Sequence, residues 1–465
     1  MLKNFIWAFV EKGGQFVIQF LSVIILSRFV SPEEFGIYGI MAIFISVSEL
    51  LVDSGFGGAL IQKRRVEQID INTLFIVNFG MSIFLYVILF CSAPLIAGYY
   101  EIPKLQLYIR VLGLAIVFYS LTIVHQSLLQ RDLRFKRSAN ITLIASIISV
   151  VGAIIVAYCR LGIWALIVQP VLMAFSLASL LWISEKRDIQ LTFSKKSFDS
   201  LWAFGSKLLV ANLLQTIYSN VSTSIIPKIA NVKISGYYYQ ASRLNSIPIG
   251  VLQTSVDKAA FPILSKEDSV NRILERARII NKVVVSCFFP FFPLISLFSK
   301  EILAVVLGVQ WLDAAPFLSV LSWGGWGLLL QALYRNIYKS IGNTKTILMI
   351  DLVKTLVGLS VLVMSVFCGV TFMIWGLTMS MYIGAILYMW KIRKDVYYTI
   401  KKQLSDFCIP VVASVLVFGV SGLIYSELQY QWYNIFMSIG SLMLYVFINI
   451  ILGNQVFAKL ACKSL

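Results

Sequence analysis

Charged residues are scarce in this 465-residue chain. Asp, Glu, Lys and Arg together make up 13% of the sequence and there is a single histidine, whereas hydrophobic residues make up 59%. A soluble domain carries about 25% charged residues, because its surface faces water. The scarcity of charge therefore excludes a soluble enzyme and indicates a membrane protein.

Motifs for catalysis and metal binding are also missing. The six cysteines stand singly, without the spacing of a metal site or a redox pair. The longest polar loops span only about 15 residues and contain no glycine-rich phosphate loop or cluster of metal ligands. We therefore expect no cofactor and no enzymatic activity. The single histidine, His125, is either a packed side chain or a proton relay.

Long apolar stretches dominate what remains. About fourteen of them approach the roughly 20 residues that a helix needs to cross a bilayer. They are 5–30, 35–60, 72–97, 105–129, 138–158, 163–184, 201–226, 235–264, 279–298, 314–340, 346–368, 372–390, 408–425 and 432–452. The sequence therefore predicts an all-α membrane protein with about fourteen transmembrane helices.

Basic residues fall almost entirely into every second loop. The even loops hold groups that begin at Lys63, Arg131, Lys186, Lys266, Lys345 and Lys391. The odd loops hold Lys104, Arg160, Lys233 and Lys300. Because cytoplasmic loops retain Lys and Arg, we expect the even loops and both termini in the cytoplasm. This topology accounts for the excess of 39 basic over 22 acidic residues, so no nucleic-acid partner is expected.

The chain also resembles itself. Shifted by 200 residues, its first quarter matches its middle without a gap, so that Gln15 meets Gln215 and Gly36 meets Gly236. Six helices separate the copies, an even number, which predicts two parallel repeats of the kind found in transporters. The expected domains are a six-helix bundle over 1–190, a second over 191–400, and two additional helices over 401–465.

Polar residues gather on one face of several apolar segments. Such residues are costly in a membrane and usually face the bundle interior or a water-filled path. The candidate substrate-binding residues of this kind are Gln15, Gln19, Gln215, Tyr218, Tyr239 and Gln253. The alternative reading is that they are hydrogen-bonding contacts between packed helices.

Buried charge gives a further expectation. Cations fall inside the segments at Arg110, Lys207, Arg243 and Arg335, and the last three are expected to lack a partner. Asp351 is expected to pair with Lys354, and Asp257 with a neighbouring cation. Spare cations suit a bulky anionic substrate, since Arg binds phosphate through two parallel hydrogen bonds.

Two acidic residues lie one turn apart in the second segment. Glu49 and Asp53 are candidates for coupling transport to H⁺ or Na⁺. The alternative is that Asp53 holds the helix end against Lys63 and Arg64.

Several short motifs resemble a known family. They are Ser31-Pro32-Glu33-Glu34-Phe35-Gly36-Ile37-Tyr38, Asp53-Ser54-Gly55-Phe56, Asn78-Phe79-Gly80, Gly236-Tyr237-Tyr238, Phe261-Pro262 and Leu307-Gly308-Val309-Gln310-Trp311. Together they resemble the Wzx-type flippases and the colanic and teichuronic acid exporters. These form the polysaccharide transporter family of the multidrug/oligosaccharidyl-lipid/polysaccharide exporter superfamily.

The resemblance implies a V-shaped, MATE-like transporter of the bacterial inner membrane. Its implied substrate is an undecaprenyl-diphosphate-linked oligosaccharide, an O-antigen or other surface polysaccharide unit, flipped from the inner to the outer leaflet by alternating access. Membrane lipids are further partners, and an association with the polysaccharide polymerase machinery stays open. The alternatives are a multidrug/cation antiporter of the same superfamily and, from another class, a membrane-embedded transferase. No loop of this chain offers the carboxylate or His-Asp pair that a transferase would need.

Overall fold

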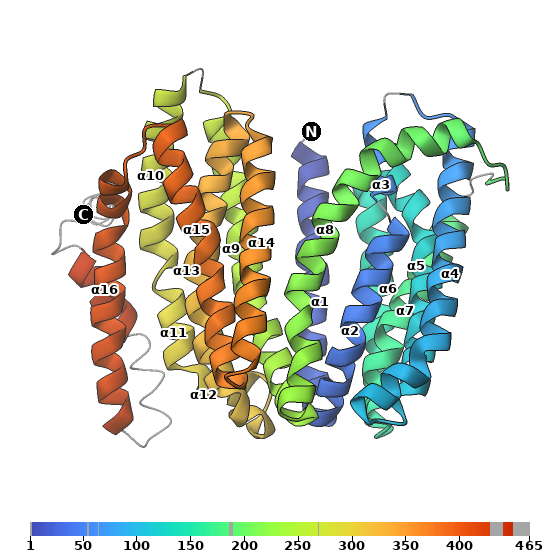
Figure 1. The fold of residues 1–465 in the computed structure, drawn as a ribbon, viewed down its shortest axis with the longest axis horizontal. Coiled ribbons are helices and arrows are strands. Elements are labelled where there is room, and N and C mark those ends of the chain that lie inside the picture. The colour runs from blue at the N-terminus through green and yellow to red at the C-terminus, as the bar shows by residue number, and fades with distance from the viewer. Residues whose placement is uncertain are drawn as a thin grey trace. The chain divides into compact units, whose positions relative to one another are not determined.

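The computed structural model describes residues 2–53, 55–63, 65–185, 189–267, 269–427 and 440–449. These residues form helices and turns, and no strand occurs among them (Figure 1). The described part of the chain contains eleven helices that are long and apolar enough to cross a membrane. The expectation of an all-α, multi-span membrane protein is therefore confirmed.

The helices follow the apolar segments closely. The first half of the chain contains α1 (Leu2–Phe29), α2 (Pro32–Asp53), α3 (Phe56–Gln62), α4 (Gln68–Tyr100), α5 (Leu105–Arg131), α6 (Phe135–Tyr158), α7 (Trp164–Ser184) and α8 (Lys195–Ile229). The second half contains α9 (Val232–Leu264), α10 (Val270–Phe288), α11 (Phe291–Leu297), α12 (Ser299–Val306), a 3-10 helix η1 (Val309–Ala314), α13 (Ala315–Ser340), α14 (Thr344–Val366), α15 (Val370–Asp395) and α16 (Ile400–Glu427).

The expected number of fourteen transmembrane helices stays a prediction. α8 and α9 coincide with two expected segments and are 35 and 33 residues long, but they are too polar to count among the eleven apolar spans. The fourteenth segment, 432–452, falls mostly outside the described residues. Its described part is the short helix Gly440–Asn449. The polar composition of α8 and α9 is what a water-filled or substrate-filled path requires of the helices that line it.

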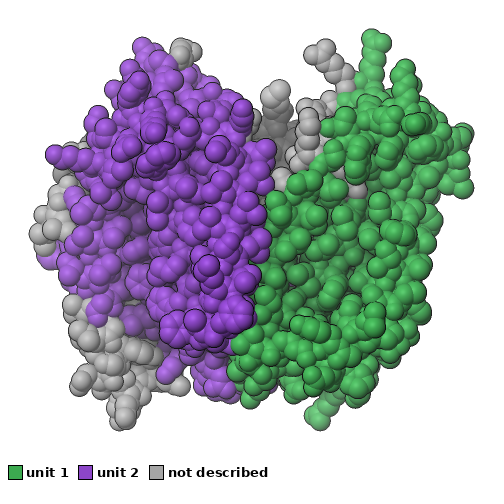
Figure 2. Space-filling model, in the orientation of Figure 1, with its two compact units in different colours: residues 1–239 green, residues 240–465 purple. Residues whose placement is uncertain are grey.

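Two compact units divide the chain, Met1–Tyr239 and Gln240–Leu465 (Figure 2). The boundary falls inside α9, whereas the sequence repeat predicts boundaries near residues 190 and 400. The two units are defined by contacts between residues, whereas the repeat is defined by similarity between sequence positions 200 residues apart. The domains predicted from the repeat, and their V-shaped arrangement, therefore stay predictions.

Helix ends follow the repeat register in one place. α1 ends at Phe29 and α8 at Ile229, and α2 begins at Pro32 while α9 begins at Val232, each 200 residues apart. The turn between α1 and α2 and the turn between α8 and α9 are therefore equivalent in the two copies.

Unit 1 is held together by α5, which packs against α2, α4 and α7. Ile40, Leu112, Ile116 and Ile167 are almost fully buried in one of its apolar clusters. The first turns of α8 lie across the end of the bundle, against α3 and α4, before the helix bends to run along α2 (Figure 1). α8 thus connects the end of unit 1 to its interior.

Unit 2 is built around α13, which packs against α15, α11 and α14. Its core buries several tyrosines whose hydroxyl groups find acceptors. Tyr334 donates to Gln403 at 2.8 Å, and Tyr398 donates to the buried Asp406 at 2.7 Å. Burial and the Asp406 carboxylate raise the pKa of Tyr398, so this phenol stays protonated and acts as a donor.

α16 is fixed to α10 through the same carboxylate. Arg278 binds Asp406 through two hydrogen bonds of 2.7 and 2.9 Å, and Lys282 lies 3.2 Å from it. Asp406 is 2% exposed, so its charge depends on these cations.

Candidate substrate and ion site

The second apolar segment is broken, and the break shapes the site. α2 ends at Asp53 and α3 begins at Phe56, with Gly55 at a φ of 69°. Only glycine adopts this left-handed conformation without strain, and a β-carbon there would also lie 2.7 Å from the carbonyl oxygen of Gly205 in α8. The backbone N–H of Gly57 donates to the Asp53 carboxylate, which holds this carboxylate at the break. Broken helices of this kind line binding sites in transporters.

A cavity of about 360 Å³ opens beside the break. It is lined by Ser46, Glu49, Leu50 and Asp53 of α2, Tyr119 of α5, and Thr216 and Asn220 of α8. Its volume lies within the roughly 300 to 1,000 Å³ of small-ligand sites. Two carboxyl groups, three hydroxyl groups and one amide therefore converge within unit 1.

The acidic residues of this cavity have no cationic partner in the described part of the chain. Neither Glu49 nor Asp53 forms an ion pair with any residue that the structure describes. A carboxylate without a counter-ion in a membrane protein is unfavourable, so such a group tends to take up a proton or a metal cation. The cavity is therefore chemically suited to a cation or a proton, and its hydroxyl groups to a sugar.

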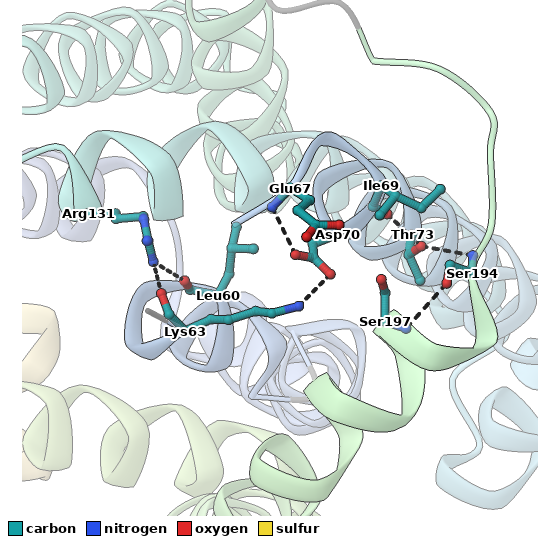
Figure 3. Close-up of polar contacts among 9 residues, drawn as sticks. All are labelled: Leu60, Lys63, Glu67, Ile69, Asp70, Thr73, Arg131, Ser194 and Ser197. Atoms are coloured by element: carbon teal, nitrogen blue, oxygen red, sulfur yellow. Dashed lines mark hydrogen bonds and ion pairs between the residues drawn. The ribbon is translucent and has the colours of Figure 1, made fainter. Parts of the chain in front are cut away.

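Lys63 does not pair with Asp53, so this part of the alternative role of Asp53 is wrong, and the part that involves Arg64 stays a prediction. Lys63 instead binds Asp70 of α4 at 2.6 Å, and Arg64 lies outside the described residues (Figure 3). In the same region Arg131 of α5 donates to the carbonyl oxygens of Leu60 at 2.9 Å and of Lys63. α3 is thus fixed at its carboxyl end by α5.

The linker before α8 is docked beside this ion pair. Thr73 accepts a hydrogen bond from the backbone N–H of Ser194 at 3.1 Å, and the Ser194 hydroxyl accepts one from Ser197 at 3.4 Å (Figure 3). Asn72 donates to the Thr192 hydroxyl at 2.7 Å and accepts from Gln190 at 3.2 Å. Asn72 and Thr73 are buried, so these bonds anchor the start of α8 to α4.

The expected cations are distributed over both units. Arg335 of α13 was expected to lack a partner, and this is wrong, since it lies 3.2 Å from Asp351 of α14. Asp351 also pairs with Lys354 at 3.1 Å, as expected. Asp257 pairs with Lys339 at 3.0 Å, which confirms its expected cationic partner.

Two other cations differ in their surroundings. Arg110 lies over the Phe90 ring of α4, 4.1 Å from its centroid, and donates to the Phe90 carbonyl. Arg243 is half-buried and has no ion-pair partner among the described residues. The side chain of Lys207 lies outside the part that the structure describes.

The uncharged candidates are spread over three helices. Tyr239 stacks edge-on against Tyr38, with ring centroids 5.9 Å apart, and Gln253 donates to the Leu328 carbonyl at 3.4 Å. Gln15 and Tyr218 are half-buried, whereas Gln19 and Gln215 are exposed. His125 is buried with its ring 5.0 Å from Trp182, which favours the packed side chain. None of these residues lines the cavity beside Asp53.

Sequence reasoning missed four polar residues of the cavity, Ser46, Tyr119, Thr216 and Asn220. A signal existed for the last two, because residues four apart share one helix face. The polar residues around Gln215 indicated that α8 has such a face. The packing of α8 against α2 shows that the cavity-lining face of α8 includes Thr216, one residue after Gln215.

Taken together, these observations define a multi-span helical membrane protein with a polar cavity among the helices of unit 1. The chain belongs to the polysaccharide biosynthesis protein family, whose model matches residues 25–316. This confirms the family resemblance of the motifs.

Named relatives match about two thirds of the chain. The teichuronic acid biosynthesis protein TuaB of Bacillus subtilis is 24% identical over 319 residues, which cover 68% of this chain and 66% of TuaB. The lipopolysaccharide biosynthesis protein WzxC of Escherichia coli is 23% identical, and the alignment covers 64% of this chain and 61% of WzxC. The aligned region therefore spans slightly less than two thirds of these relatives.

Solved structures share the fold along more of the chain. The lipid II flippase MurJ, in an inward closed conformation, superposes with a TM-score of 0.79 at 14% identity, covering 98% of this chain and all of MurJ. An inward-facing multidrug resistance MATE transporter gives a TM-score of 0.63 at 16% identity, covering 84% of this chain and 98% of the transporter. At these identities the two likenesses show the fold, in agreement with the prediction of a MATE-like helical membrane protein.

Proposed function

We propose that the protein is a flippase for a lipid-linked oligosaccharide. It would move an undecaprenyl-diphosphate-linked unit of a surface polysaccharide from the inner to the outer leaflet of the bacterial cytoplasmic membrane. The observation that carries this proposal is the family match over residues 25–316, with relatives named for teichuronic acid and lipopolysaccharide biosynthesis. Both termini lie in the cytoplasm in this proposal, because the basic loops do.

The substrate would be bound by the polar and cationic side chains of the interior. Arg243 is the strongest candidate for the diphosphate, since no described carboxylate neutralises it, and Lys207 is the second. Arg335 and Lys354 share the single carboxylate of Asp351, so this group of three residues keeps one net positive charge for the substrate. Arg110, Gln15, Gln19, Gln215, Tyr218, Tyr239 and Gln253 complete the proposed substrate contacts. The lipid tail would stay in the bilayer while the two repeats alternate between states.

Glu49 and Asp53 are the proposed coupling residues. Their cavity offers oxygen atoms to H⁺ or Na⁺ and no described counter-ion, so the bound cation would supply the missing charge. Coupling would follow if the cavity binds the cation more tightly in one state than in the other.

A complementation assay tests the flippase. In a deletion strain, the lipid-linked oligosaccharide should accumulate and surface polysaccharide should be lost, and the wild-type gene should restore both. Arg243→Ala and Lys207→Ala should each reduce restoration, because a charge-assisted hydrogen bond contributes about 1.5 to 3 kcal/mol, or roughly tenfold to hundredfold in affinity. Arg243→Lys should rescue only partly, since ammonium cannot make the forked contact.

The matched control is Arg393→Ala, which removes an exposed arginine at the end of α15. If the Arg243 and Lys207 variants insert at normal levels and restore surface polysaccharide as well as Arg393→Ala does, the cationic site is wrong. If no lipid-linked oligosaccharide accumulates in the deletion strain, the flippase function is wrong.

A multidrug/cation antiporter is the second candidate. The two carboxyl groups of the cavity favour it, because acidic groups attract cationic drugs. It predicts that the deletion strain becomes sensitive to cationic drugs while its surface polysaccharide is unchanged.

A further inference from the structure

A second cavity, of about 380 Å³, lies at the turn between α5 and α6 in unit 1. It is lined by Leu133, Arg134, Lys136, Arg137 and Asn140. Three of these five residues are cations, and none is acidic. The cavity shares no lining residue with the one beside Asp53. This cavity would therefore bind a ligand of its own, and its positively charged lining favours an anion.

The two arginines are held in place by one buried carboxylate. Arg134 and Arg137 bind Glu185 at 2.8 and 2.6 Å, and Arg137 also donates to the Ser184 carbonyl. Glu185 is 7% exposed and neutralises only one of the cavity's three positive charges. A guanidinium has five N–H donors, and the contacts found among the described residues leave several of them available on Arg134. The arginines are thus ordered before a ligand arrives, which lowers the entropic cost of binding.

Lys136 and the helix end add to the attraction for an anion. The Lys136 ammonium lies 5.5 Å from the centroid of the Trp7 ring of α1 and forms no ion pair with a described residue. α6 begins at Phe135 without a side-chain cap, so its first N–H groups and the positive end of its dipole point to the same turn.

The cavity lies where lipid headgroups lie. The apolar span of α5 ends at Arg131 and that of α6 begins at Phe135, so the turn between them stands at the membrane surface. Leu133, at the cavity wall, is 58% exposed, and aromatic residues such as Trp7 favour the same interface.

An apolar track leads away from the cavity along α6. Ile144, Ile147, Val151 and Ile155 are exposed and follow Asn140 at steps of three or four residues. This spacing places them on one face of the helix, directly below a cavity residue. A phosphate in the cavity and an acyl chain along this face would belong to a single amphiphilic molecule.

We infer that this cavity binds the phosphate of an anionic phospholipid, with an acyl chain along α6. The site is separate from the proposed transport path and does not depend on it. Arg134, Lys136 and Arg137 supply the charge, Asn140 a hydrogen bond, and the α6 face the apolar contact. Arginine and lysine together suit a phosphodiester, which is both charged and rich in acceptor oxygens.

Lipid titration of the purified full chain in a non-ionic detergent tests this site. The probes are short-chain phosphatidylglycerol, the matching phosphatidylcholine and inorganic phosphate. Phosphatidylglycerol should bind at least about tenfold more tightly than either of the others, and Lys136→Gln should weaken it roughly tenfold. Asn140→Ala gives a second variant at an exposed position and should weaken it several-fold.

Lys394→Gln is the matched control. Lys394 also lies over a tryptophan ring, 4.4 Å from the centroid of Trp390, but it lines neither cavity. Its removal should leave phosphatidylglycerol binding unchanged. Equal binding of phosphatidylglycerol and phosphatidylcholine, or equal effects of Lys136→Gln and Lys394→Gln, would overturn the site. Inorganic phosphate binding as tightly as the lipid would show a simple ion site and would overturn the lipid assignment.

Discussion

Gly36 and Gly236, 200 residues apart and equivalent in the repeat, each pack against the turn that carries the other. A β-carbon on Gly36 would lie 1.9 Å from the carbonyl oxygen of Val232, and one on Gly236 would lie 1.7 Å from that of Pro32. Both obstacles are backbone atoms, so no side chain can move aside to make room. Glycine at both positions therefore lets the start of α2 and the start of α9 touch.

Replacing either glycine should separate these two turns. We expect Gly236→Ala to lower the free energy of unfolding by about 1 to 3 kcal/mol through overpacking, and to reduce transport if the contact forms during the cycle. Thermal unfolding in detergent and complementation measure the two effects. Gly250→Ala in α9 is the control, because a β-carbon there meets nothing within 4 Å. Equal stability of the two variants would contradict a required contact.

Neutralising the cavity acids should abolish ion coupling without unfolding the protein. Asp53→Asn and Glu49→Gln keep the side-chain volume and remove the charge that a proton or Na⁺ would compensate. Transport in proteoliposomes should lose its dependence on the ion gradient, while expression stays normal. Glu33→Gln, at an exposed position in the first turn of α2, is the control and should retain coupling. Low expression of Asp53→Asn with normal coupling would instead indicate a structural role.

Removing Arg278 should destabilise the attachment of α16. Arg278→Ala leaves the buried Asp406 with Lys282 and the Tyr398 hydroxyl, and breaking a buried ion pair costs about 3 to 5 kcal/mol. We expect a lower unfolding temperature and faster proteolysis at the start of α16. Arg276→Ala is the control, since Arg276 is exposed and its partner Glu267 lies on the surface loop before α10. Similar effects of the two substitutions would show that the double hydrogen bond contributes little.

Cysteine labelling tests the topology. In a cysteine-free background, single cysteines at Lys136 and Lys394 should be shielded from an impermeant thiol reagent in intact cells, and one at Lys104 should be labelled. The native cysteines must be removed first, because Cys91, Cys159, Cys368 and Cys408 are exposed. Labelling at Lys394 from outside would reverse the proposed orientation.

The sequence predicts the helices better than the site. The length of each apolar run decides whether a helix crosses the membrane, and this length can be read directly. The break at Gly55 escaped prediction, because a glycine within an apolar run does not show whether its φ is positive. The structure shows the break, and it also shows the backbone of Gly205 in α8 packed closely against Gly55.

Charge pairing shows the same limit. Asp351 and Lys354 are one turn apart on α14, so their contact follows from helix geometry alone. Arg335 reaches Asp351 from a different helix, and its pairing depends on how α13 packs against α14. Pairs within a helix can therefore be predicted from spacing, whereas pairs between helices cannot.

The interruption between α2 and α3 divides one apolar segment into two helices that can move separately. Arg131 ties the far end of α3 to α5, while α2 meets α3 at the left-handed Gly55. A small rotation about this joint would carry Glu49 with α2, whereas the Gly57 N–H of α3 holds the Asp53 carboxylate at the joint. Glu49 would then lie on the moving wall of the cavity, and Tyr119 of α5 on its fixed wall, with Asp53 at the joint between them.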